Sequence, residues 1–83
     1  MYILYFERGD GRRAYINFCE FTSVGKVNFF TMMEDISNSY IKHAYRFSSY
    51  EDCEKIVQEF YNRMLNRSDL SFLADYNCKI EKV

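Results

Sequence analysis

The sequence contains no proline and no tryptophan, only three glycines, and a single histidine, His43. With one histidine and no Ser/His or Cys/His pairing, nucleophilic catalysis has few groups to work with. No apolar run approaches the roughly 20 residues of a membrane-spanning helix. We therefore expect neither an enzyme nor a membrane protein.

Cysteine is also scarce, and its spacing excludes the usual cysteine-based sites. Cys19, Cys53 and Cys78 lie far apart and form no C-x-x-C motif, whereas a zinc site needs about four ligands, usually in close pairs. An odd count argues against a secreted disulfide framework. The apolar start, residues 1–6, ends at Glu7, so we expect no signal peptide. These features predict buried free thiols in a cytoplasmic protein, with no metal and no cofactor.

Neither charge sign is in excess. Eleven Lys and Arg residues face twelve Asp and Glu residues, for a net charge of −1. A duplex-DNA binder normally carries a large positive excess. With 83 residues, of which 48% are hydrophobic and 28% charged, the composition predicts one globular domain.

Aromatic residues are abundant, with eight Tyr and eight Phe. Alternating, aromatic-rich segments predict strands at residues 2–8, 12–21, 27–33 and 74–81. The segment Gly9–Asp10–Gly11 predicts a hairpin turn, and Gly25 marks a second turn. The tripeptide Arg8–Gly9–Asp10 is interpreted as part of this hairpin and not as an adhesion motif.

Residues 40–47 admit two interpretations. Alternation of Ile41, His43, Tyr45 and Phe47 favours a further strand. The alternative is a short helix that begins near Asp35. Residues 34–39 are polar and predict a loop.

One amphipathic helix is predicted from Ser48 or Ser49 to about Asn66. Ser48 and Glu51 fit a capping box, and Glu51–Lys55 and Glu59–Arg63 are stabilising i,i+4 pairs. The apolar stripe of this helix comprises Cys53, Ile56, Val57, Phe60 and Met64. The predicted fold class is α+β: an antiparallel four- to five-stranded sheet with one long amphipathic helix packed on one face, as ββββαβ or βββααβ.

A single helix covers one face of a sheet, so the alternation divides the strand residues into two groups. The predicted inner group is Tyr2, Leu4, Phe6, Ile16, Phe18, Val27, Phe29, Tyr76, Cys78 and Ile80. The predicted outer group is Ile3, Tyr5, Tyr15, Phe21, Phe30 and Met32. An exposed aromatic group on a small protein predicts an interface, either with another protein or in a homodimer. The alternative is that a twisted sheet or a connecting segment covers these rings.

The predicted partner-binding residues combine these rings with the first hairpin. Arg8, Arg12 and Arg13 cluster near its tip. Arginines interleaved with aromatic residues also suit single-stranded nucleic acid, which is the alternative function, although no stretch matches the RNP1 pattern. The candidate site comprises Tyr5, Arg12, Arg13, Tyr15, Asn17 and Phe30.

Residues 44–60 (AYRFSSYEDCEKIVQEF) and 76–82 (YNCKIEK) resemble small accessory proteins of bacteriophages and prophages. In those proteins an A-x-x-F-x-S-x-E segment leads into one amphipathic helix and a closing strand. The resemblance implies a non-enzymatic inhibitor of host defence, of the kind represented by anti-CRISPR proteins. It implies that the protein acts in the host cytoplasm by occluding a host protein, with a CRISPR effector as a candidate target.

Overall fold

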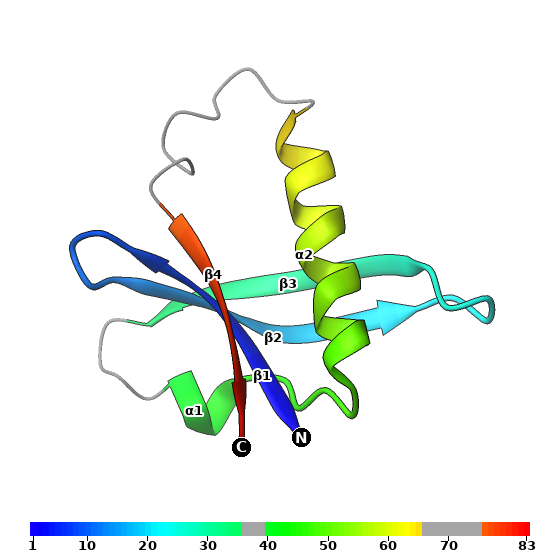
Figure 1. Cartoon of the computed structure of the whole chain (residues 1–83), viewed down its shortest axis with the longest axis horizontal. Coiled ribbons are helices and arrows are strands. Elements are labelled where there is room, and N and C mark those ends of the chain that lie inside the picture. Colours follow the sequence, from blue (N-terminus) through cyan, green and yellow to red (C-terminus); the bar gives the residue numbers. More distant parts are fainter. Residues whose placement is uncertain (36–39, 66–75) are drawn as a thin grey trace.

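The computed structural model describes residues 1–35, 40–65 and 76–83. Four strands form one antiparallel sheet in the order β3-β2-β1-β4, and helix α2 lies across one face of it (Figure 1). This confirms the α+β class. Helix α2 has 16 residues, about 24 Å at 1.5 Å per residue, so it is of ordinary length and not a long helix. In chain order the elements are β1 (Tyr2–Arg8), β2 (Arg13–Phe21), β3 (Val27–Asp35), α1 (Tyr40–His43), α2 (Tyr50–Leu65) and β4 (Tyr76–Lys82).

Glycines form both predicted turns. Gly11 and Gly25 have φ angles of 89° and 80°, a region that side chains with a Cβ rarely adopt. Gly11 N donates to the Arg8 carbonyl at 3.0 Å, and Gly25 N donates to the Thr22 carbonyl at 2.9 Å. The chain therefore reverses twice where the sequence predicted it.

Strands β1 and β2 separate along their length. β1 pairs with β4 over all seven of its residues but with β2 only from Tyr5↔Tyr15 to Glu7↔Arg13. Beyond that point, residues 44–47 supply the missing hydrogen bonds. Tyr45 N donates to the Ile16 carbonyl at 2.8 Å, while Tyr2 and Phe47 exchange two backbone bonds of 2.9 and 2.8 Å.

The strand favoured for residues 40–47 is therefore wrong. Residues Tyr40–His43 form the short helix α1, and the segment that follows makes one isolated bridge, between Phe47 and Tyr2. Three backbone hydrogen bonds from this segment pair with N–H and C=O groups of β1 and β2 where these strands diverge, without a continuous strand. The loop predicted for residues 34–39 is wrong at Glu34 and Asp35, which belong to β3, and its remaining residues, 36–39, lie outside the described residues. So do the connection at 67–73, strand residues 74 and 75, and the side chains of Met64 and Tyr76.

The β2–β3 pairing contains two shifts of register. Ile16 pairs with Met32 and Phe18 with Thr31, so Asn17 is an extra residue in β2. Further along, Glu20 pairs with Phe29 and Phe21 with Val27, which skips Asn28 in β3. Since side chains alternate between the faces of a sheet, one extra residue moves those that follow to the opposite face.

The face covered by α2, here the helix face, carries the larger core. Cys53, Ile56 and Phe60 of α2 are 0–2% exposed, and Val57 packs against the same core, which confirms these four positions of the predicted stripe. They pack with Leu4, Phe6, Ile16, Cys19 and Phe47. Phe21, Val27, Phe30 and Met32 border this cluster, so placing Phe21, Phe30 and Met32 on the outer face is wrong. The extra residues Asn17 and Asn28 are the cause.

Local contacts fix the start of α2. The Ser49 hydroxyl accepts a hydrogen bond from the Asp52 backbone N–H at 3.2 Å, so Ser49 is the N-cap and not Ser48. Arg63 pairs with Glu59 at 2.9 Å as predicted, whereas Lys55 lies 3.9 Å from Asp52.

Candidate protein-binding surface

The predicted anchor rings Tyr5 and Tyr15 lie on the face opposite α2, but they are buried, with 4% and 3% of their surface exposed. They form a second cluster with Ile3 and Ala44. The expectation that these rings stay exposed is wrong. The chain returns after α1 and places Ala44 against them.

Polar contacts fix both rings in place. The Tyr5 hydroxyl donates to Glu81 Oε1 at 2.7 Å, and the Arg13 guanidinium lies 4.9 Å from the centre of the Tyr5 ring. The Tyr15 hydroxyl donates to the Met33 sulfur at 3.5 Å. Tyr5 and Tyr15 therefore contribute to the stability of the fold. A partner could reach their rings only if these contacts opened.

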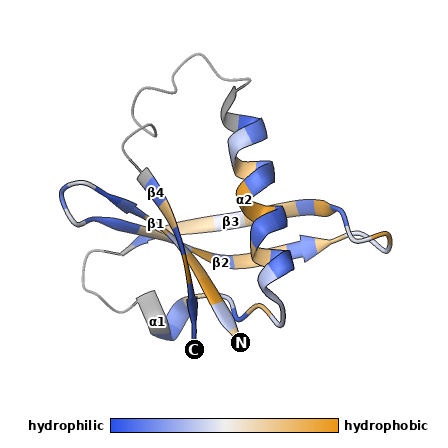
Figure 2. Cartoon of the chain, in the orientation of Figure 1, coloured by the Kyte–Doolittle hydropathy of each residue, from blue (hydrophilic) through white to orange (hydrophobic). Residues whose placement is uncertain are grey.

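The arginines of the first hairpin are paired with carboxylates. Arg13 Nε lies 3.0 Å from Glu7 Oε2, and Asp10 lies 3.6 Å from both Arg8 and Arg12. Arg12 also lies 3.8 Å from Glu34. Exposed pairs of this kind add little stability, yet three guanidinium groups here face three carboxylates. The tip, coloured hydrophilic in Figure 2, is therefore close to neutral overall.

The remaining predicted site residues, Asn17 and Phe30, lie elsewhere. Asn17 Oδ1 accepts a hydrogen bond from the Thr31 hydroxyl at 2.6 Å. Phe30 borders the core of the helix face, with the Arg63 guanidinium 4.9 Å from its ring centre. The six predicted residues are thus divided between the two faces and the hairpin tip, and they do not form one surface.

A different set of side chains is exposed together. Phe18, Phe29 and Met33 are 48%, 39% and 49% exposed, and the Phe18 and Phe29 ring centroids are 5.5 Å apart. Phe18 pairs across the sheet with Thr31, and all four residues lie on the face opposite α2. We call Phe18, Phe29, Thr31 and Met33 the β3 patch.

Phe18 of the β3 patch is connected to the buried core through Tyr45 and Phe47. Phe18 packs edge-on against Tyr45 at a centroid distance of 6.3 Å, and Tyr45 packs against Phe47 at 4.9 Å. Phe47 is 1% exposed. The exposed rings therefore sit on a fixed base, which lowers the conformational entropy lost when a partner binds.

Sequence reasoning missed the β3 patch because it assumed uninterrupted alternation. It placed Phe18 and Phe29 inside, and the register shifts turn both outward. The available signal was weak: Asn17 and Asn28, at the two shifts, belong to a residue type that is depleted in strands.

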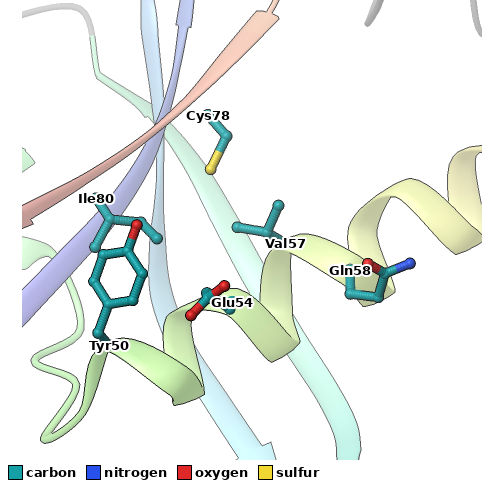
Figure 3. A pocket seen from close by; sticks show the side chains of 6 residues that line it. All are labelled: Tyr50, Glu54, Val57, Gln58, Cys78 and Ile80. Atoms are coloured by element: carbon teal, nitrogen blue, oxygen red, sulfur yellow. The ribbon is translucent and has the colours of Figure 1, made fainter.

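A shallow groove of about 350 Å³ lies between α2 and β4 (Figure 3). Its lining comprises Tyr50, Glu54, Val57, Gln58, Cys78 and Ile80. Burial raises the pKa of the Cys78 thiol to about 11, so this sulfur is protonated at neutral pH and is a poor nucleophile. Among the described residues that line the groove, Cys78 is the only thiol, and it is not activated for covalent catalysis.

The other two thiols are also protonated at neutral pH. Cys19 and Cys53 are buried and free, and burial raises the pKa of Cys19 to about 11 and that of Cys53 to about 12. Within residues 1–35, 40–65 and 76–83, no three His, Cys, Asp or Glu residues are grouped to hold a metal ion. The cysteines therefore pack as small apolar side chains.

Comparison with models of protein families, with curated proteins and with solved structures gives no match to this chain. In the part of the chain that the structure describes, neither helix has the length and apolar character needed to cross a bilayer. A functional assignment therefore depends on the surface of the molecule.

Proposed function

We propose that the protein is a non-enzymatic binding protein that docks the β3 patch against another protein and so occludes part of that partner. The observation that carries this proposal is the exposed Phe18–Phe29 ring pair beside Met33. Adjacent apolar side chains on a rigid strand pair are typical of the buried centre of an interface.

The apolar surface is large enough to contribute usefully to binding. A phenylalanine buries on the order of 200 Å², so exposures of 48% and 39% leave roughly 170 Å² of ring surface on Phe18 and Phe29. At about 25 cal/mol per Å², covering this surface contributes about 4 kcal/mol before the entropic cost of association. Met33 adds to this amount.

The resemblance of residues 44–60 and 76–82 to phage accessory proteins suggests the kind of partner. It supports a host protein in the bacterial cytoplasm, with a CRISPR effector as the specific candidate. The net charge of −1 does not favour mimicry of nucleic acid, which requires a strongly acidic surface. Steric occlusion or locking of the effector is therefore the mechanism that we propose.

The test compares Phe18→Ser/Phe29→Ser with Tyr61→Ser. Tyr61 is a matched control because it is an exposed aromatic residue, 44% accessible, on α2. The wild type and both variants are used to capture proteins from host lysate. Each captured protein is then purified and its affinity measured directly, together with target cleavage if it is a CRISPR effector.

We expect the double variant to lose the captured protein and any inhibition of cleavage, whereas Tyr61→Ser keeps both. Equal binding by the two variants would refute a role for the β3 patch. Single-stranded nucleic acid binding remains the alternative function, but the balanced charges at the hairpin tip give it no added support. Oligonucleotide binding at low salt that is lost in Arg12→Ala/Arg13→Ala would favour it instead.

A further inference from the structure

Strand β3 forms one outer edge of the sheet, and β2 is its only neighbour among the described strands. The charged residues of β3 are confined to its last two positions, Glu34 and Asp35, and Val27 to Met33 include no charged residue and no proline. The other edge strand, β4, carries Lys79, Glu81 and Lys82. Charges and prolines are the usual features that stop an edge strand from pairing with another chain. β3 is therefore the less protected edge.

The register shift limits how β3 could pair with a further strand. At the skipped residue Asn28, the backbone carbonyl accepts a hydrogen bond from Arg63 at 3.4 Å, which occupies that end of the edge. Regular alternation then runs from Phe29 to Asp35. A new partner strand would thus find its uninterrupted edge in this segment.

Two copies of β3 fit one another in one antiparallel register. About a two-fold axis perpendicular to the sheet, side chains of the same face meet. An axis at Thr31 sets Phe29 opposite Met33 of the second copy, and Phe30 opposite Met32. Moving the axis to Met32 would set Phe30 against Glu34, an apolar side chain against a charge.

The charges at the two ends of β3 favour the same arrangement. Lys26 directly precedes β3, and Glu34 is near its end, with its side chain 50% exposed. Antiparallel pairing brings the Lys26 end of one copy beside the Glu34 end of the other. With the axis at Thr31, Glu34 of one copy lies opposite Asn28 of the other, two residues from Lys26. Symmetry produces this arrangement twice, and opposite charges on neighbouring strands are stabilising. Glu34 also lies 3.8 Å from Arg12 of its own copy.

We propose that a second copy of this chain pairs with the first along β3, with the two-fold axis at Thr31. The two four-stranded sheets then become one continuous sheet of eight strands. Both β3 patches lie on the same face of this sheet and meet at Thr31 on the axis. The dimer goes beyond the proposed function, because it requires no other protein, and a monomer could still bind a partner through one patch.

Light scattering after size-exclusion chromatography tests the pairing directly. We expect the mass of the wild type to rise from 10.1 kDa to twice that value as concentration increases. Thr31→Lys places two ammonium groups opposite each other and should weaken association about tenfold or more. The matched variant Asn77→Lys, an exposed polar residue on the β4 edge, should dimerise as the wild type does.

A charge-reversal pair tests the register itself. Thr31→Glu should also be monomeric, and mixing it with Thr31→Lys should restore a 1:1 dimer. Circular dichroism checks that each variant is folded. A wild type that stays monomeric at about 1 mM, where even weak association is visible, overturns the proposal even if no variant folds. Undiminished dimers of Thr31→Lys, or dimers lost only in Asn77→Lys, also overturn it.

The test also separates the dimer from the proposed function. If the wild type dimerises and also captures a partner protein that Phe18→Ser/Phe29→Ser loses, both proposals stand. If the wild type dimerises and captures no partner, the dimer stands and the proposed function fails. If the wild type pairs only with the strand of another protein and never with itself, the dimer proposal fails.

Discussion

The sharpest prediction concerns Tyr15, which the sequence suggested as a binding anchor and the structure places in a core. We expect Tyr15→Ala to lower the free energy of unfolding by about 3–5 kcal/mol, the range for deleting a buried aromatic ring. The ring is 3% exposed and packs with Ile3, Tyr5 and Ala44.

The size of this loss matters because the chain is short. At about 0.05–0.15 kcal/mol per residue, 83 residues give a total stability of roughly 4–12 kcal/mol. Tyr15→Ala would therefore remove a large part of it. Tyr15→Phe deletes only the hydroxyl that contacts the Met33 sulfur at 3.5 Å and should cost less than about 1 kcal/mol.

Urea unfolding followed by circular dichroism measures these differences, with Phe18→Ala as the control. Phe18 is 48% exposed, so Phe18→Ala should lower the free energy of unfolding by less than about 1 kcal/mol. It should leave the slope of that free energy against urea concentration unchanged. A Tyr15→Ala variant as stable as Phe18→Ala would show that the second cluster is not a core. The prediction that the Tyr15 ring is exposed to solvent would then be restored.

Two further predictions follow from local contacts. Ser49→Ala should lower the free energy of unfolding by about 1 kcal/mol in thermal unfolding, because it removes the N-cap of α2. An equal loss in Ser48→Ala would show that the N-cap is not specific to Ser49. Stability should also fall as pH rises above about 9, the pKa of 9.0 expected for unfolded thiols, towards the folded pKa of about 11 for Cys19 and about 12 for Cys53. Over that window the unfolded chain releases thiol protons that the folded chain retains, so each buried thiol subtracts up to about 1.4 kcal/mol per pH unit. Urea unfolding by circular dichroism at pH 8, 9 and 10 checks the slope, and a Cys53→Ala variant with an unchanged slope would contradict the assignment.

The elements that the sequence predicted well are those with strong local patterns. Alternation defined β1, glycine marked both hairpin turns, and the apolar spacing of Cys53, Ile56 and Phe60 located the buried side of α2. These features arise from residues close together in the chain, so the sequence carries them directly.

The site was harder to predict because it depends on which face of the sheet each strand residue points to. A single extra residue, Asn17, places Phe18 on the face opposite α2, and the skipped Asn28 lets both Val27 and Phe30 face the helix. Within a window of alternating residues, only the weak tendency of asparagine to avoid strands indicates which residue lacks a partner on the next strand. Prediction of the candidate site from Tyr5 and Tyr15 failed because of a contact distant in sequence: Ala44 packs against both rings and lies 39 positions after Tyr5 and 29 after Tyr15.

The sequence by itself determined the class of fold, the two hairpins and the amphipathic helix, because propensity, turn chemistry and periodicity are local properties. Only the tertiary structure decided which aromatic rings face solvent. That choice was made by the register between β2 and β3 and by the insertion of residues 44–47 between β1 and β2. Both are non-local hydrogen-bonding arrangements, set by backbone groups that are identical in every residue and so leave little trace in the order of side chains.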